Sequence, residues 1–194
     1  MLDKKELIDQ ILTIELKMFL SVPTAEKANC QSYPENFKLH RKAQFSAWSE
    51  LTLRSYLNDL KTAQKSDQNL MTMKYARMEN LIDQENLNPL IPEIVSIQFN
   101  WQMEMFKKYP HFMAGARPLF QCDDSLLRTS FETYLKGELE TYSDKTLSLL
   151  YRDILSKKET GINMSTEVYD VLAKEFGYNS IEEADLARKC VTNK

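Results

Sequence analysis

Glycine is scarce in this chain, and its scarcity limits the folds that the chain can adopt. Only 4 of the 194 residues are glycine, and the 6 prolines cluster at apparent breaks between stretches whose apolar residues recur at helical spacing. This pattern is typical of long helices joined by short loops. We therefore predict one all-α domain over residues 1–194, a helical bundle of about six to seven helices.

Capping residues, prolines and glycines set the expected helix boundaries. The second and fifth helices are expected to be long, the fifth with a bend at Gly137, and residues 109–121 are expected to form a loop. No internal repeat is evident. The expected helices cover approximately residues 4–20, 34–64, 69–83, 92–108, 125–158 and 165–176, with a last helix beginning near residue 180.

Residues 95–105 give conflicting indications, because their apolar side chains alternate strictly, as in a strand. Three observations nevertheless favour a helix. Pro92 suits a first helical turn, the segment of about 17 residues is longer than most strands, and no other strand pattern occurs with which it could pair. We predict a helix here.

Composition and charge exclude several classes of protein. Hydrophobic residues make up 43% of the chain and aromatic residues 10%, which is enough for a packed core and argues against disorder. The formal net charge of −3 does not resemble the basic footprint of a nucleic-acid binder. No stretch approaches the roughly 20 apolar residues that span a bilayer, and no signal-peptide pattern is recognisable. We expect a cytoplasmic protein that contacts neither membrane nor nucleic acid.

No metal or cofactor motif is recognisable. His40 and His111 are the only histidines, and neither has the glutamate three residues earlier that di-iron bundles use. Cys30, Cys122 and Cys190 lack the two-residue spacing of zinc or redox motifs, so free thiols are expected. Glycine-rich phosphate loops are also missing. We expect no bound metal and no cofactor.

Glu138, in the segment 129–143, is the strongest candidate for a site. Helical spacing puts Tyr134, Glu138 and Tyr142 in one row, which continues from Leu127 and Phe131 and therefore faces the interior. A carboxylate on an apolar stripe is costly unless a cation pairs with it. We therefore expect Glu138 to have a basic partner inside the protein.

Several charged residues share this placement on apolar helix faces. They are Glu15, Arg41, Asp59, Lys74 and Glu138. The candidate partners of Glu138 are Arg41 and Lys74 from other helices and Arg117 from the loop. Asp59 follows Arg41 by 18 residues on one predicted helix, about 27 Å at 1.5 Å per residue, so these two residues are expected to serve different neighbourhoods.

Two interpretations of these charges remain open. They are either structural ion pairs that lock helices together, or the lining of an interhelical pocket for a small polar or anionic ligand. In the second case tyrosines supply hydroxyls and a basic residue holds an anion. The ligand-binding residues would be Arg41, Tyr56, Lys74, Arg117, Tyr134, Glu138 and Tyr142. In an enzyme Glu138 would be the general acid or base.

A different function is a protein-interaction or accessory module without catalytic activity. In that case the abundant methionines and aromatic residues would form a groove for a partner helix, and the charged residues would only hold the scaffold. A protein partner or a homo-oligomer fits this interpretation. Core filling is the competing explanation for the same methionines and aromatic residues.

Several short segments together resemble the bacterial family known as domain of unknown function 4125. They are Glu15 with Met18-Phe19, Cys30-Gln31, Arg41 with Trp48, Ser55-Tyr56-Leu57 with Asp59-Leu60, Asn69-Leu70, Lys74 to Met78, Tyr109-Pro110, Arg117, residues 129–143, and Phe176-Gly177-Tyr178. The resemblance implies one helical domain in the cytoplasm, implies no activity, and allows an accessory role beside nucleotidyltransferase-like domains. The family often has Gly-Arg where this chain has Asp67-Gln68.

Overall fold

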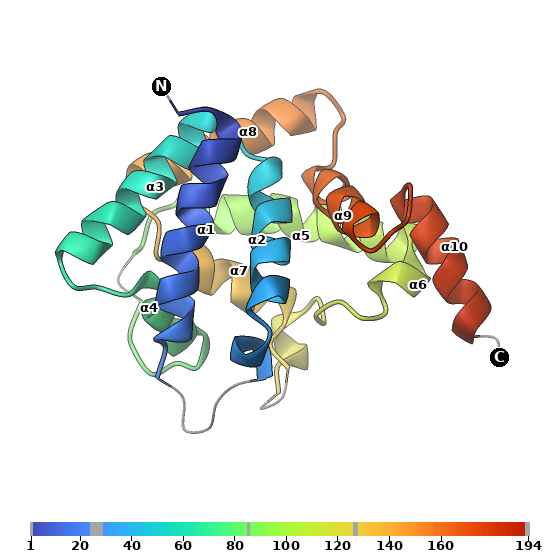
Figure 1. Cartoon of the computed structure of the whole chain (residues 1–194), viewed down its shortest axis with the longest axis horizontal. Coiled ribbons are helices and arrows are strands. Elements are labelled where there is room, and N and C mark those ends of the chain that lie inside the picture. Colours follow the sequence, from blue (N-terminus) through green and yellow to red (C-terminus); the bar gives the residue numbers. More distant parts are fainter. Residues whose placement is uncertain (1, 24–28, 85, 126–127, 193–194) are drawn as a thin grey trace.

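The computed structural model describes residues 2–23, 29–84, 86–125 and 128–192, which form ten α-helices and two 3₁₀ helices and contain no strand (Figure 1). The all-α prediction is therefore confirmed. The α-helices are α1 (Lys4–Leu20), α2 (Pro34–Ser46), α3 (Glu50–Lys65), α4 (Leu70–Met78), α5 (Leu90–Lys108), α6 (Pro110–Met113), α7 (Phe131–Leu139), α8 (Asp144–Glu159), α9 (Met164–Glu175) and α10 (Ile181–Thr192). The 3₁₀ helices are η1 (Asn29–Ser32) and η2 (Gln121–Asp123).

The predicted number of six to seven helices is wrong, chiefly because both long helices are broken. The expected helix 34–64 is divided between α2 and α3, and the expected helix 125–158 between α7 and α8. A serine caps the second helix of each pair. Ser49 Oγ accepts a hydrogen bond from the Thr52 backbone N–H at 3.3 Å, and Ser143 Oγ accepts one from the Thr146 backbone N–H at 3.2 Å. These bonds satisfy donors that a helix start leaves unpaired, so each serine favours a new helix over continuation of the old one.

The remaining boundaries follow local chemistry. Asn69 caps α4, which ends at Met78 and so stops before the expected residue 83, and Asn80 just beyond it has a left-handed φ of 56°. The last expected long helix begins only after Ser130, and α9 begins at Met164 with Asn163 as its cap, close to the expected start at residue 165. α5 is a helix, as predicted. The short α6 lies within the segment expected to be a loop.

Six of the ten α-helices in the described residues form two three-helix units. α1 packs against α2 and α3, and α5 packs against α7 and α8. The units meet where α3 packs on α8, while α4 lies against α1 and α7, and α9 packs on α2 and α5. In Figure 1, α1 lies between α3 and α2, α5 passes behind them, and α10 occupies the end of the molecule near the C-terminus.

An aspartate of α8 binds the first turn of α3. Asp153 Oδ2 accepts hydrogen bonds from the Ser49 backbone N–H at 2.9 Å and from Thr52 Oγ1 at 2.6 Å. An anion at a helix N-terminus also interacts favourably with the helix dipole. Asp153 therefore ties α8 to the start of α3.

The same arrangement occurs again with the two helices exchanged. Asp59 Oδ2 of α3 accepts hydrogen bonds from the Ser143 backbone N–H at 3.2 Å and from Thr146 Oγ1 at 2.6 Å at the start of α8. The pattern Ser-x-x-Thr-x₆-Asp thus occurs twice, 94 residues apart, and each aspartate binds the other copy. This reciprocity indicates an internal repeat with approximate two-fold symmetry, so the expectation that the chain has no repeat is wrong.

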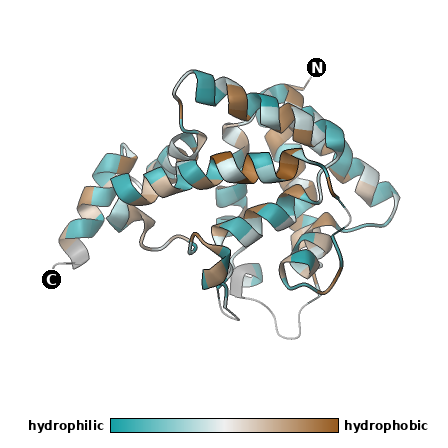
Figure 2. Ribbon diagram, turned by 180° about the vertical axis from the view of Figure 1, so that it is seen from behind, coloured by the Kyte–Doolittle hydropathy of each residue, from teal (hydrophilic) through white to brown (hydrophobic). Residues whose placement is uncertain are grey.

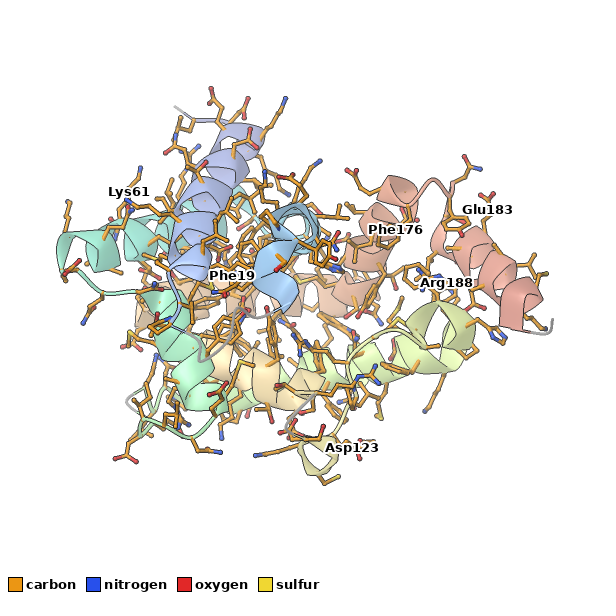
Figure 3. The ribbon with its side chains drawn as sticks, turned by 60° about the horizontal axis from the view of Figure 1, so that its bottom comes forward. Phe19, Lys61, Asp123, Phe176, Glu183 and Arg188 are labelled. Carbon is orange, nitrogen blue, oxygen red and sulfur yellow. The ribbon has the colours of Figure 1, made fainter. Side chains whose placement is uncertain are left out.

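Apolar side chains form two clusters among the described residues. The larger lies between the two three-helix units, and the smaller joins the end of α5 to α6, α9 and α10. Hydrophobic and hydrophilic residues alternate along the helices in Figure 2, as expected when each helix buries one side. In Figure 3, Phe19 lies in the interior near α1 and α2, whereas Lys61 and Asp123 lie at the margin. No described helix is both long and apolar enough to cross a membrane.

Candidate functional site

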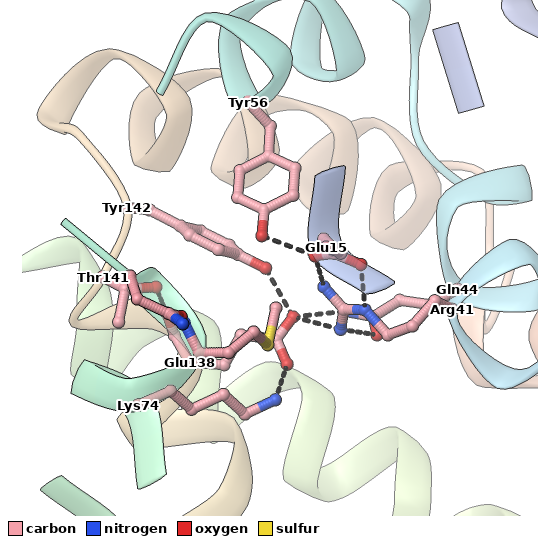
Figure 4. Close-up of polar contacts among 10 residues, drawn as sticks. Glu15, Arg41, Gln44, Tyr56, Lys74, Glu138, Thr141 and Tyr142 are labelled. Carbon is pink, nitrogen blue, oxygen red and sulfur yellow. Dashed lines mark hydrogen bonds and ion pairs between the residues drawn. The ribbon is translucent and has the colours of Figure 1, made fainter. Parts of the chain in front are cut away.

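Glu138 of α7 lies at the centre of a buried network of polar side chains (Figure 4). Its Oε1 accepts hydrogen bonds from Arg41 Nη1 at 2.7 Å, from Gln44 Nε2 at 2.9 Å and from the Tyr142 hydroxyl at 2.5 Å. Its Oε2 accepts one from Lys74 Nζ at 2.7 Å. Glu138 is only 2% exposed, so its inward position and its pairing with Arg41 and Lys74 are confirmed.

Arg41 of α2 links Glu138 to a second buried acid, Glu15 of α1. The Arg41 Nε and Nη2 atoms donate to the two carboxylate oxygens of Glu15 at 2.8 and 2.5 Å, in the bidentate geometry that suits arginine. The hydroxyl of Tyr56 on α3 donates to Glu15 at 2.6 Å. Two carboxylates and two cations from four helices therefore balance one another, and Tyr56 connects a fifth helix to them.

The charges of this network fix its protonation states. Burial alone would raise the pKa of Glu138, but the positive charges of Arg41 and Lys74 outweigh burial and hold this pKa well below its ordinary value. Burial and the neighbouring carboxylates raise the pKa values of Tyr56 and Tyr142 well above their ordinary range. At neutral pH the acid is therefore ionised and the two tyrosines are hydrogen-bond donors.

This arrangement makes Glu138 poorly suited to proton transfer. A general acid or base works best when its pKa lies near the operating pH. The pKa of Glu138 is far lower, and both of its oxygens already accept hydrogen bonds from charged donors. The geometry suits a carboxylate that positions Arg41, Gln44 and Lys74.

A cleft of about 670 Å³ lies above the network, bounded by α2, α5, α7 and α9. Because Arg41 and Glu138 are buried and also line the cleft, they form its floor together with the half-buried Gln44. The walls are mainly aromatic and aliphatic, with a few amide side chains. Wall residues include Phe37, Trp48, Gln98, Trp101, Gln102, Phe131 and Leu172.

Arg117 and His40 line the cleft and are exposed, so they lie at its mouth. Arg117 places its guanidinium carbon 4.3 Å from the ring centroid of Tyr134, and its Nη1 donates to the Thr129 carbonyl at 3.1 Å. The buried Lys74 Nζ lies 3.5 Å from the same ring centroid, but Lys74 does not line the cleft. His40 is exposed, yet the surrounding protein lowers its pKa by desolvation and the charge of Arg117 lowers it further, so His40 is mostly neutral at pH 7.

The cleft lies on the approximate two-fold axis of the repeat. Residues of α2 and α7 that are 94 positions apart line it in matching pairs. These pairs are Phe37 with Phe131, His40 with Tyr134, Arg41 with Leu135, and Gln44 with Glu138. Gln44 and Glu138 bond directly, and the rings of the next pair, Trp48 and Tyr142, have centroids 5.9 Å apart. Equivalent residues in contact are expected only close to the axis.

The seven predicted ligand-binding residues divide into two groups. One group lines the cleft and consists of Arg41, Arg117, Tyr134 and Glu138. The other group, Tyr56, Lys74 and Tyr142, is not among the lining residues and supports the floor from behind. Arg117, one of the three suggested partners of Glu138, contacts the face of Tyr134 instead.

Arg41 and Asp59 lie on different helices, because the predicted helix that carried both is broken. Their separation into different neighbourhoods is nevertheless confirmed. Arg41 binds Glu15 and Glu138, whereas Asp59 binds the start of α8. The side chain of Cys30 and the whole of Leu127 lie outside the described residues.

The sequence reasoning missed Gln44 and His40, which line the cleft beside Arg41. Neither residue is unusual on its own in a helix. The signal that could have found Gln44 is the repeat, because aligning the two Ser-x-x-Thr motifs pairs it with Glu138. In the described parts of the chain, no group of three or more His, Cys, Asp or Glu side chains is arranged to hold a metal ion.

Comparison with known proteins identifies the family. Residues 5–186 match the family described as "Protein of unknown function (DUF4125)". No curated protein and no solved structure matches the chain. The match covers nearly the whole sequence and includes both copies of the repeat and all residues of the buried network. The chain therefore belongs to the DUF4125 family.

Proposed function

We propose that this protein binds a small molecule with a polar or anionic group in the cleft between α2, α5, α7 and α9. The observation that carries the proposal is a cavity of about 670 Å³ with largely apolar walls and a fixed polar floor. Sites for small molecules in proteins are typically of this size and combine apolar walls with a few well-placed polar groups.

The buried network supports this function by fixing the floor. Arg41 is held by Glu15 and Glu138, and Gln44 both accepts from Arg41 at 2.7 Å and donates to Glu138 at 2.9 Å. Side chains fixed in this way lose little conformational freedom when a ligand binds. The network thus serves as a structural ion-pair cluster and as one surface of the binding site.

A thermal-shift screen of the purified protein against metabolites tests the proposal, since a ligand that binds only the native state raises the Tm. Gly115 lines the cleft, and a Cβ added there would meet no atom within 4 Å. We therefore expect Gly115→Trp to obstruct the cleft, keep the fold and abolish the shift. The matched control is Ala114→Trp, because Ala114 is exposed and does not line the cleft. A shift that survives in Gly115→Trp would contradict the proposal.

A further inference from the structure

We propose that the ligand is a planar aromatic mono-anion, with its anionic group at Arg117 and its ring system between Phe37 and Phe131. This inference rests on the proposed function and specifies its ligand class. It follows from the distribution of charge in the cleft, from the matching aromatic pair on its walls, and from the way in which Arg117 is held.

The charge available to a ligand is concentrated at the mouth. At the floor, Arg41 and Glu138 neutralise each other within the network. Arg117 lines the cleft and makes no ion pair with any described residue, although Asp124 lies close enough for Arg117 to lower its pKa. The oxygens of Asp124 accept hydrogen bonds from Ser130 and Thr133. Among the described residues that line the cleft, Arg117 is the one cation without an ion pair, which favours a ligand with one anionic group.

The walls favour a flat apolar body. Phe37 and Phe131 line the cleft from α2 and α7 at equivalent positions of the repeat, one on each side of its axis. Trp101 and Leu172 complete the apolar wall from α5 and α9. One face of Phe37 is stacked on Phe19, with ring centroids 4.3 Å apart. A planar ring system would therefore pack against its other face or its edge, in offset or edge-to-face geometry.

Arg117 is already positioned for an anion. Its guanidinium lies against the Tyr134 ring, and one nitrogen is used by the Thr129 carbonyl. The guanidinium has further N–H groups that can bind a carboxylate or sulfonate. His40, neutral at pH 7, adds a hydrogen-bonding group at the same mouth without a second charge.

Fluorescence titration with two probes of similar shape tests the inference. The probe 8-anilinonaphthalene-1-sulfonate is a mono-anion with a planar naphthalene ring system, and N-phenyl-1-naphthylamine is its neutral counterpart. We expect Arg117→Gln to weaken binding of the anion about tenfold, as loss of a charge-assisted hydrogen bond predicts, and to leave the neutral probe unchanged. Arg117→Lys should recover part of the loss. The control, Arg152→Gln, changes an exposed arginine of α8 outside the cleft and should alter neither probe.

The outcomes separate this inference from the proposed function. Gly115→Trp should block both probes. If both probes bind Gly115→Trp as well as the unmodified protein, they do not occupy the cleft and the inference fails, whereas the proposed function is decided by the thermal-shift screen. If Gly115→Trp blocks both probes but Arg117→Gln binds the anion with unchanged affinity, the cleft is a binding site and the assignment of the anion to Arg117 is overturned.

Discussion

The α2–α3 half and the α7–α8 half of this fold have the same serine-capped helix break but carry different side chains near their common two-fold axis. In each half, one helix ends and the next begins after a serine, and an aspartate of that second helix accepts a hydrogen bond from the capping serine of the other half. At the axis, however, Gln44 and Arg41 of the first half stand opposite Glu138 and Leu135 of the second. The symmetric part builds the scaffold, and the asymmetric part supplies the charges that line the cleft.

The largest effect is expected from replacing Arg41 with its counterpart, as Arg41→Leu. After this change Glu138 still has Lys74 as its ion-pair partner, whereas the buried carboxylate of Glu15 has lost its cation. Removing one partner of a buried ion pair typically costs 3–5 kcal/mol, so we expect a loss of about 4 kcal/mol in the free energy of unfolding. Urea denaturation measures it. The matched control, Arg152→Leu on the surface of α8, should change stability by less than about 0.5 kcal/mol. Equal losses in both variants would mean that the network is not structural.

Glu138→Gln makes the acid identical to Gln44 and should have the next largest effect. Lys74 is 1% exposed and loses its carboxylate partner, so we expect a loss of about 2–3 kcal/mol at pH 7, partly offset by hydrogen bonds that the amide retains. The network should still fold, because Arg41 keeps its bidentate contact with Glu15.

The pH dependence of this loss follows from the low pKa of Glu138. A carboxyl whose folded pKa lies below its unfolded value of 4.5 contributes stability above pH 4.5, and that contribution falls as the pH drops toward the folded pKa. The stability difference between the unmodified protein and Glu138→Gln should therefore be about 2 kcal/mol smaller at pH 3 than at pH 7, at 1.36 kcal/mol per pH unit. Urea titrations at both pH values measure it. A difference independent of pH would show that the network does not hold the pKa of Glu138 below its unfolded value.

The two aspartates test the symmetry itself. Asp59→Asn and Asp153→Asn each weaken two equivalent hydrogen bonds at the start of the opposite helix. We expect each variant to lose about 1–2 kcal/mol, because the bonds are charge-assisted but only partly buried. Thermal or urea unfolding compares them. If the two variants lose free energies of unfolding that differ by more than about 1 kcal/mol, the two aspartates do not contribute equally and the two halves are not energetically equivalent.

The sequence predicted the parts of this fold that depend on local periodicity. The burial of Glu138 and its pairing with Arg41 follow from helical spacing and from the cost of an unpaired buried charge. The alternating stretch in α5 is helical, and its buried residues Trp101, Gln102 and Met105 lie on one helical face rather than at every second position. The breaks before Ser49 and Ser143 could not be predicted from periodicity, since they depend on aspartates about 100 residues away in the chain. The cleft depends on the packing of four helices, which no local pattern encodes.

The smallest effect is expected where the halves differ by one methyl group, at Ala43 and its counterpart Gly137. Alanine at 137 would gain about 1 kcal/mol of helix propensity, but its Cβ would lie 2.9 Å from Met78 Cγ and 3.3 Å from the Lys74 carbonyl oxygen. These two effects nearly cancel, so Gly137→Ala should lose less than about 1 kcal/mol. In a Met78→Ala background the closest contact disappears, and the same substitution should become stabilising by several tenths of a kcal/mol, measured as a double-mutant cycle. If Gly137→Ala is destabilising by the same amount in both backgrounds, the Lys74 carbonyl sets the spacing of α4 and α7, and glycine is required there by the backbone rather than by Met78.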